Sequence, residues 1–208
     1  MTDDTPLDPA SSAALIAEQR AKVLAATDVD GRVLFGAWGV AWLLGFGVLW
    51  VAATERLTMS EEAAFLVFTS LLALAGIVSS WHLAVKGTGV RGASARQGAM
   101  YGWAWFLSFG VVFALAVALD RAGATDEVMN VAITVAALLA VGALYMAGGA
   151  VWDERLQWAL GAWIAVSTIV AALIGAPHMY LVMCIGGGGG MLVAAAAEAI
   201  RRRPAREL

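Results

Sequence analysis

Charged residues are scarce in this sequence, and their scarcity excludes an ordinary soluble globule. Lys, Arg, Asp and Glu together make up 14% of the 208 residues, whereas 61% are hydrophobic. A water-soluble domain of this size needs more polar side chains to cover its surface. The composition therefore indicates an integral membrane protein whose surroundings are the lipid bilayer, and we expect no nucleic-acid partner.

Cysteine and histidine are nearly absent as well, which removes most catalytic and metal-binding chemistry. Cys184 is the single cysteine, so an internal disulfide and a multi-cysteine metal site are excluded. The two histidines, His82 and His178, have no companions at metal-ligand spacing. No HExxH, GxSxG or GxxxxGK[ST] motif occurs, and no pair of acids falls inside an apolar stretch. We therefore expect no enzymatic activity, no metal and no cofactor.

Long uncharged stretches separate the few charged islands. Each is close to the roughly 20 residues with which a helix crosses a hydrocarbon core about 30 Å thick. The six stretches cover residues 33–53, 63–85, 99–119, 128–152, 156–174 and 177–199. The predicted fold is all-α, with six transmembrane helices in a domain spanning residues 32–200. Residues 1–31 form an N-terminal segment in which Asp8 and Pro9 precede an alanine-rich run, so a short helix is expected there, and residues 201–208 form a basic tail.

Basic residues are distributed unevenly between the two ends of these stretches. Eleven of the thirteen Lys and Arg fall on the side of the N-terminus, and only Arg56 and Arg121 fall on the other side. Basic residues are enriched on the cytoplasmic side of a membrane. Both termini are therefore predicted to be cytoplasmic. The first thirty residues are acidic at their start and lack the basic and apolar regions of a signal peptide.

A partial repeat relates the first and third spans. The segment "WLLGFGVLW" from Trp42 matches "WFLSFGVVF" from Trp105 at an offset of 63 residues. Ser60 and Thr125 precede paired acids ahead of the second and fourth spans, a pattern that favours a helix N-terminus through capping and the helix dipole. These correspondences predict three helical hairpins in parallel orientation.

Five consecutive glycines at 186–190 interrupt the sixth span. Each weakens a helix by about 1 kcal/mol relative to alanine, and five in a row leave no face of the helix with a side chain. In one interpretation, neighbouring helices surround the segment closely. In the other, it opens beside a polar site within the membrane. The second hypothesis predicts a substrate path formed by Ser108, Ser167, Thr168, Gly186, Gly188, Gly190, Trp105 and Trp163.

Ordinary structural roles compete with this path. Serine and threonine in membrane helices commonly bond to their own backbone one turn earlier. The tryptophans gather toward the cytoplasmic side, which fits either an aromatic-lined vestibule or an interfacial belt with helix packing. No charged residue lies at depth in a span, so the sequence does not favour proton coupling. Glu198, near the end of the sixth span, is expected to form a solvated ion pair with Arg201 and Arg202.

The loop between the second and third spans is glycine-rich and basic. Lys86, Arg91 and Arg96 supply three positive charges without a neighbouring acid. This loop is either a topological determinant beside anionic lipid or a contact for an anionic ligand or a partner subunit. Two functions therefore stay open: permeation or transport of a small neutral or hydrophobic solute, and a non-catalytic accessory or regulatory subunit. Such a subunit would bind a membrane or cytoplasmic protein, and a homo-oligomer is a further alternative.

Four segments carry a resemblance to a known group of proteins. They are "LIAEQRAKV", "WGVAWLLGFG", "GVRGASARQGAMYGWAW" and "YLVMCIGGGGGMLVAA". Together they resemble uncharacterised actinobacterial six-span integral membrane proteins, some of which are loosely labelled transporter or permease. The resemblance implies the six-span topology and a location in the bacterial plasma membrane. It implies no functional residues.

Overall fold

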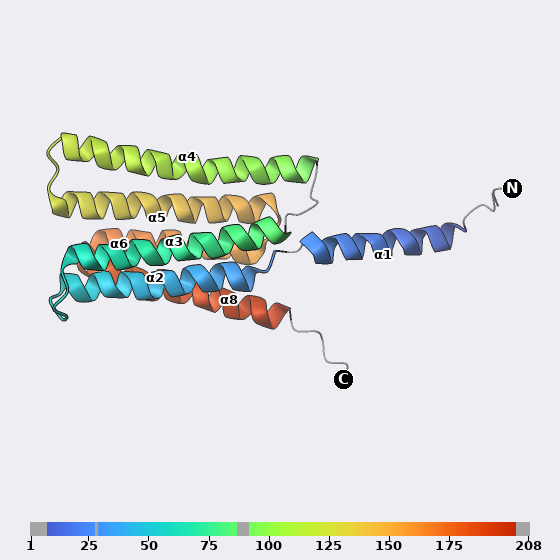
Figure 1. Cartoon of the computed structure of the whole chain (residues 1–208), viewed down its shortest axis with the longest axis horizontal. Coiled ribbons are helices and arrows are strands. Elements are labelled where there is room, and N and C mark those ends of the chain that lie inside the picture. The colour runs from blue at the N-terminus through green and yellow to red at the C-terminus, as the bar shows by residue number, and fades with distance from the viewer. Residues whose placement is uncertain (1–7, 28, 87–91, 203–208) are drawn as a thin grey trace.

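All the elements in the described part of the chain are helices. A computed structural model describes residues 8–27, 29–86 and 92–202. Six of its helices are long and apolar enough to cross a membrane (Figure 1). They are α2 (Gly31–Ala53), α3 (Glu61–Lys86), α4 (Ala93–Arg121), α5 (Asp126–Val151), α6 (Arg155–Ile174) and a sixth span, His178–Arg201. The all-α class and the six apolar spans are thus confirmed, and each expected stretch coincides with one of these helices.

The sixth span is built from three helical pieces. It begins as α7 (His178–Val182), continues as the π-helix η1 (Met183–Gly189) and ends as α8 (Gly190–Arg201). A π-helix is wider than an α-helix, is rare, and is frequently found at functional positions. The glycine segment therefore remains helical, but most of it does not follow regular α-helical geometry.

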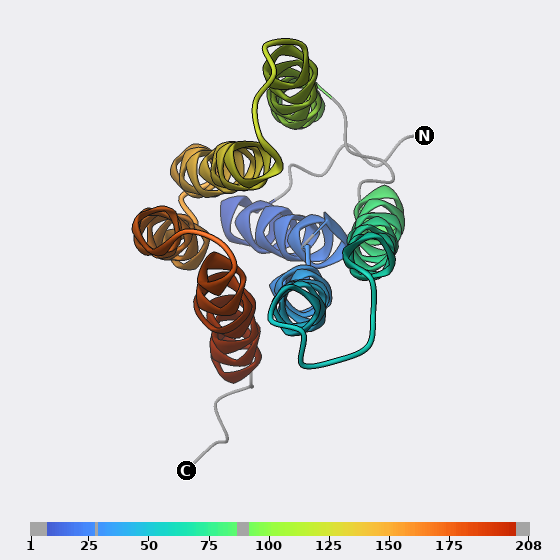
Figure 2. The ribbon, with the colours of Figure 1, turned by 90° about the vertical axis from the view of Figure 1, so that its left-hand side faces the viewer.

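The spans pack as an open row. Their order is α4, α5, α6, the sixth span, α2 and α3, so α4 and α3 form its two ends. Figure 2 shows that this row is bent into an arc. No residue of the apolar window of α4 is buried, whereas a third of the window of α2, α5, α6 and the sixth span is buried. The core therefore lies among the four inner spans.

Side-chain caps fix the starts of three spans. The Ser60 hydroxyl accepts a hydrogen bond from Ala63 N at 3.2 Å, and the Thr125 hydroxyl accepts one from Val128 N at 3.4 Å. Both are the residues that the sequence pattern predicted. Asp30, which was not predicted, caps α2 by accepting from Arg32 N at 2.9 Å. Each cap satisfies a backbone N–H that a helix start leaves without a partner.

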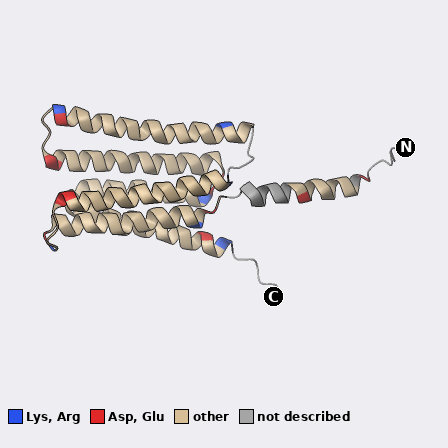
Figure 3. Cartoon of the chain, viewed as in Figure 1, with Lys and Arg blue, Asp and Glu red and all other residues tan. Residues whose placement is uncertain are grey.

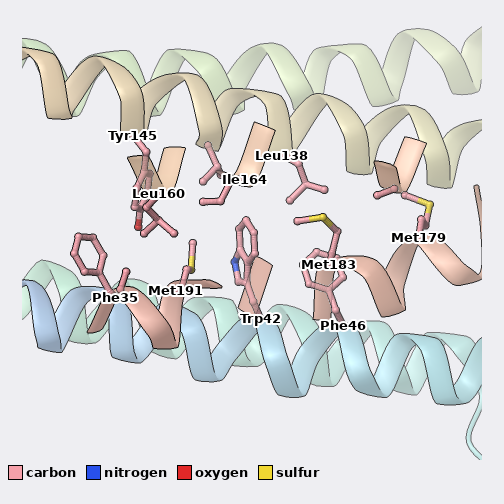
Figure 4. Packing of buried hydrophobic residues seen from close by; sticks show 13 residues of the cluster. Phe35, Trp42, Phe46, Leu138, Tyr145, Leu160, Ile164, Met179, Met183 and Met191 are labelled. Atoms are coloured by element: carbon pink, nitrogen blue, oxygen red, sulfur yellow. The ribbon is translucent and has the colours of Figure 1, made fainter. Parts of the chain in front are cut away.

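Glycines bring α5 and α6 into backbone contact. A Cβ added at Gly161 would lie 2.7 Å from Gly142 O, and one at Gly149 would lie 2.5 Å from Trp158 N. Small residues allow such an approach, which drives helix association in membranes through van der Waals packing. Larger side chains then fill the space between these helices, α2 and the sixth span (Figure 4).

The first helix, α1 (Pro9–Thr27), stands apart from the spans. Figure 1 shows it projecting beyond the end of the bundle at which α2 begins. It has no extensive packing with any other helix of the described chain. Figure 3 shows that charged residues of the spans lie close to their ends, which leaves the middle of the bundle uncharged.

Candidate functional site

The glycine segment packs against α2 on one side. A Cβ added at Gly188 would lie 2.5 Å from the backbone nitrogen of Leu43 and 3.1 Å from Gly39 O. One added at Gly187 would lie 2.7 Å from the ring of Trp42. Both glycines are buried. Because each has only a hydrogen atom in place of a side chain, the sixth span and α2 can approach this closely.

On its other side the segment packs against α6. The Trp163 indole donates a hydrogen bond to Gly186 O at 2.8 Å, and a Cβ added at Gly190 would lie 2.6 Å from the same indole nitrogen. A Cβ at Gly186 would lie 3.0 Å from the Ser167 hydroxyl. Gly189 differs from the other four, because nothing lies within 4 Å of its Cβ position. Four of the five glycines thus face a neighbouring helix.

Apolar side chains fill the remaining space around the segment. Met183 and Ile164 are fully buried, and Met191 and Trp42 are 1% and 4% exposed. Figure 4 shows these side chains meeting between α2, the sixth span and the two helices α5 and α6. Unbranched methionine adapts to irregular gaps of this kind. This arrangement matches the interpretation in which neighbouring helices surround the glycines closely.

The predicted path residues fall into two separate groups. Ser167 and Thr168 are buried on α6, beside Trp163 and the glycines. The Thr168 hydroxyl donates to Ile164 O at 2.8 Å, which is the backbone bond expected of an ordinary hydroxyl in a membrane helix. Ser108 lies on α4, whose packing is against α5, so the structure does not bring it to the glycine segment.

Trp105 belongs to an aromatic group between α4 and α5. Its ring meets those of Tyr101 and Tyr145 edge to face, with centroids 6.2 and 6.0 Å apart. The Tyr101 hydroxyl donates to Leu144 O at 2.7 Å. Trp105 therefore packs α4 against α5. These contacts do not bring it to Trp163 or to the glycine segment. Two further tryptophans that were predicted to lie on the cytoplasmic side, Trp81 and Trp103, are 71% and 61% exposed on separate helices, as in an interfacial belt.

A charged cluster ties α2 and the sixth span together at the α1 end of the bundle. Glu198 is only 2% exposed and pairs with both Arg201 and Arg202. The Arg201 contact, 2.8 Å long, is an ion pair without the alignment of a hydrogen bond. Arg202 also donates to Val29 O at 3.0 Å, just before α2. The expectation of a solvated pair at Glu198 was therefore wrong about solvation, because the start of α2 covers the carboxylate.

Two contacts extend this cluster to α3 and α6. The backbone N–H of Asp30 donates to His82 Nε2 at 3.1 Å, which joins the end of α3 to the start of α2. Arg201 reaches Glu154, which precedes α6, at 3.1 Å. The sequence pattern did not reveal this connection, because its members are far apart along the chain and only Glu198 was considered with its own neighbours.

The basic loop residues lie near the same end of the bundle. Lys86 is the last residue of α3, and Arg96 lies in the first turn of α4. Arg91 lies outside the described residues, so the structure places only Lys86 and Arg96 of the three predicted basic residues. The basic tail, from residue 203 onward, is outside them too.

Asp30 predicts a pH dependence of stability. Hydrogen bonding from Arg32, which approaches both carboxylate oxygens, is the main reason that the pKa of Asp30 falls to about 2 from 3.8. A depressed pKa stabilises the fold above about pH 4, and this contribution is lost as the pH falls toward about 2. We expect the melting temperature of the wild type in detergent to decrease across this interval more than that of Asp30→Asn. Equal decreases would show that the Asp30 contact does not stabilise the folded protein.

No constellation for metal chemistry is found within the described ranges. They contain no group of three His, Cys, Asp or Glu side chains that could hold a metal ion. No model of a known protein family matches the chain, and neither a curated protein nor a solved structure matches it. The structure therefore shows six helices that are long and apolar enough to cross a membrane, within the described residues.

Proposed function

We propose that this chain is a non-catalytic accessory or regulatory subunit of a membrane complex that binds a partner protein through α1. Its six spans anchor it as three hairpins, with both termini in the cytoplasm of a bacterial cell. The uneven distribution of basic residues supports this orientation, since eleven of thirteen lie on the proposed cytoplasmic side. The resemblance to actinobacterial membrane proteins supports the plasma membrane as the location.

The isolation of α1 is the observation that carries this proposal. Its 19 residues form a helix that projects from the bundle without extensive packing against another described helix (Figure 1). Helices in proteins obtain most of their stability from the packing of one face. Leu15 and Ile16 are neighbouring apolar residues on α1, 54% and 55% exposed. A partner that covers them would supply the packing that this chain lacks.

Charge near the base of α1 supports the same surface. Lys86 and Arg96 lie at the bundle end from which α1 projects, and both come from the predicted basic loop. The partner surface would therefore present apolar side chains to α1 and acidic side chains to Lys86 and Arg96. Complementary charge of this kind chiefly sets orientation and the rate of association.

Transport of a small neutral or hydrophobic solute is the second candidate function, and the π-helix favours it. Such helices are frequent at functional positions, and η1 places Gly186 O within reach of Trp163. A solute path here would require the packed residues Trp42 and Met183 to move. Flux of radiolabelled neutral solutes into proteoliposomes would test this candidate without reference to α1.

A site-specific cross-link tests the partner proposal in the full-length protein. A photoreactive amino acid at position 15 is expected to form an adduct with one distinct protein in native membranes, and Ile16→Asp is expected to reduce the adduct at least fivefold. Leu57→Asp, an equally exposed change at the opposite end, serves as the control and should leave it unchanged. Adducts with lipid alone would assign α1 to the membrane surface, and adducts with a second copy would indicate a homo-oligomer. Either result would overturn the proposal of a distinct partner.

A further inference from the structure

An apolar groove opens between α2 and the sixth span, far from the charged cluster. It has a volume of about 370 Å³, which lies within the range of small-ligand sites. Its walls come from the second half of α2, from Leu181 and Cys184, and from Leu57 and Met59 in the turn before α3. Leu44 and Leu57 in these walls are 51% and 58% exposed. The groove is therefore open along the side of the bundle, where the surroundings are lipid.

The absence of a side chain at Gly47 keeps the groove deep. A Cβ added there would meet only Cys184 Sγ, at the ordinary contact distance of 3.6 Å. The Cys184 thiol donates in turn to Leu43 O at 3.2 Å. The groove floor is thus formed by a glycine and a thiol whose hydrogen bond is internal. Because the thiol already has a hydrogen-bond partner, the floor of the groove suits an apolar ligand.

Two polar groups mark one end of the groove. Trp50 contributes to its wall, and the indole Nε1 is buried without a hydrogen-bond partner in the described chain. The Arg56 guanidinium lies 4.3 Å from the centre of the Trp50 ring. Glu55, Glu61 and Glu62 also lie near this end of the chain's spans, but no carboxylate among the described residues pairs with Arg56. The Trp50 ring thus brings an unused N–H donor, itself buried, and a cation stacked on the ring to one end of the groove.

We propose that this groove binds the acyl chain of an anionic glycerophospholipid. The chain lies along Leu44, Gly47 and Leu181, where only apolar atoms are needed. Tryptophan at a membrane interface stands at the level of lipid headgroups. When the lipid binds, the Trp50 indole turns so that its buried N–H reaches the groove and donates to an ester carbonyl. The phosphate then lies beside Arg56. Satisfying a buried donor and pairing a cation distinguish this lipid from the lipids that merely surround the bundle.

The groove is independent of the proposed partner surface. Arg56 and Trp50 lie at the end of α2 that is opposite to α1, so a lipid bound here would not contact Leu15 or Ile16. If the lipid proposal fails, the proposed role of α1 is not affected. If the proposed role of α1 fails, the lipid proposal is not affected. Different measurements therefore decide the two.

Native mass spectrometry of the full-length protein tests the lipid site. The delipidated protein is titrated with phosphatidylglycerol and, separately, with zwitterionic phosphatidylcholine. We expect one phosphatidylglycerol to bind at least tenfold more tightly than the next, and Arg56→Gln and Trp50→Phe each to weaken that first site about tenfold. Arg121→Gln, which removes the other basic residue at this end, is expected to leave it intact.

A steric variant completes the test. Gly47→Leu is expected to fill the groove and abolish the tight phosphatidylglycerol site, whereas Gly110→Leu should not. Gly110 corresponds to Gly47 in the repeat, and nothing lies within 4 Å of its Cβ position. Because Gly47→Leu risks misfolding, Arg56→Gln and Trp50→Phe decide the matter if it does not fold. Binding that all variants retain, or that shows no preference for phosphatidylglycerol, would mean surrounding lipid only and would overturn the proposal.

Discussion

Replacing Gly188 with leucine is expected to leave no folded protein. Even the first carbon of the new side chain would lie 2.5 Å from the backbone nitrogen of Leu43 and 2.8 Å from its Cα. Backbone atoms cannot rotate away, so α2 and the sixth span would have to separate along a buried contact. Overpacking of a well-packed core typically costs 1–3 kcal/mol, and Gly188→Ala alone is expected to cost about 3 kcal/mol. The measurement is the yield of monodisperse protein in detergent and its melting temperature.

Gly189 supplies the matched control one residue away. It belongs to the same π-helix, but nothing lies within 4 Å of its Cβ position. Gly189→Ala should therefore keep the wild-type melting temperature or raise it, because alanine favours a helix by up to about 1 kcal/mol over glycine. If Gly188→Ala and Gly189→Ala behaved alike, the close contact between the glycine segment and α2 would be refuted.

Replacing Glu198 with alanine is the second change for which we expect a large effect. The carboxylate is almost fully buried and pairs with Arg201 and Arg202, which are 53% and 25% exposed. Removing one partner of a buried pair commonly costs 3–5 kcal/mol. Because the two arginines can turn to solvent, we expect a smaller loss of about 2 kcal/mol. The loss is measured as a lower melting temperature of the detergent-solubilised protein.

Two variants distinguish the buried charge from other causes. Glu198→Gln keeps the shape of the side chain, so a loss in this variant reports the missing charge and not a cavity. Glu62→Ala removes an exposed acid from the first turn of α3 and should cost only a few tenths of a kcal/mol. An unchanged melting temperature in Glu198→Ala would show that the charged cluster does not stabilise the end of the bundle.

The sequence was sufficient for the features that depend on local composition. Uncharged stretches of the right length predict the six spans, because crossing a membrane is a demand on each helix separately. Ser60 and Thr125 predict helix starts, because a cap acts on backbone groups two or three residues away. The length of the glycine run likewise predicts that no face of the helix carries a side chain, whatever its neighbours are.

Features that depend on which helices meet were predicted less well. Trp42 and Trp105 occupy matching positions in the repeat, yet Trp42 is buried beside the glycines and Trp105 packs between α4 and α5. Similar depth in the membrane suggested that Ser108 and Ser167 share a site, but depth does not fix the order of helices around a bundle. Glu198 was judged by its neighbours in α8, whereas its burial comes from the start of α2.

The reactivity of a cysteine at position 167 tests most directly whether the glycine segment is closely packed or lines a water-filled path. Ser167 on α6 faces Gly186, and a reactive thiolate requires contact with water. The native Cys184 lines the apolar groove, so it is replaced with serine. The protein carrying Cys184→Ser, Ser167→Cys and Thr58→Cys, the last at an exposed turn residue, is placed in proteoliposomes with a charged methanethiosulfonate reagent on both sides. We predict that position 58 is labelled completely before position 167 shows measurable labelling by peptide mass spectrometry. Labelling of position 167 at a rate within tenfold of that at position 58 would contradict close packing and favour a solute path.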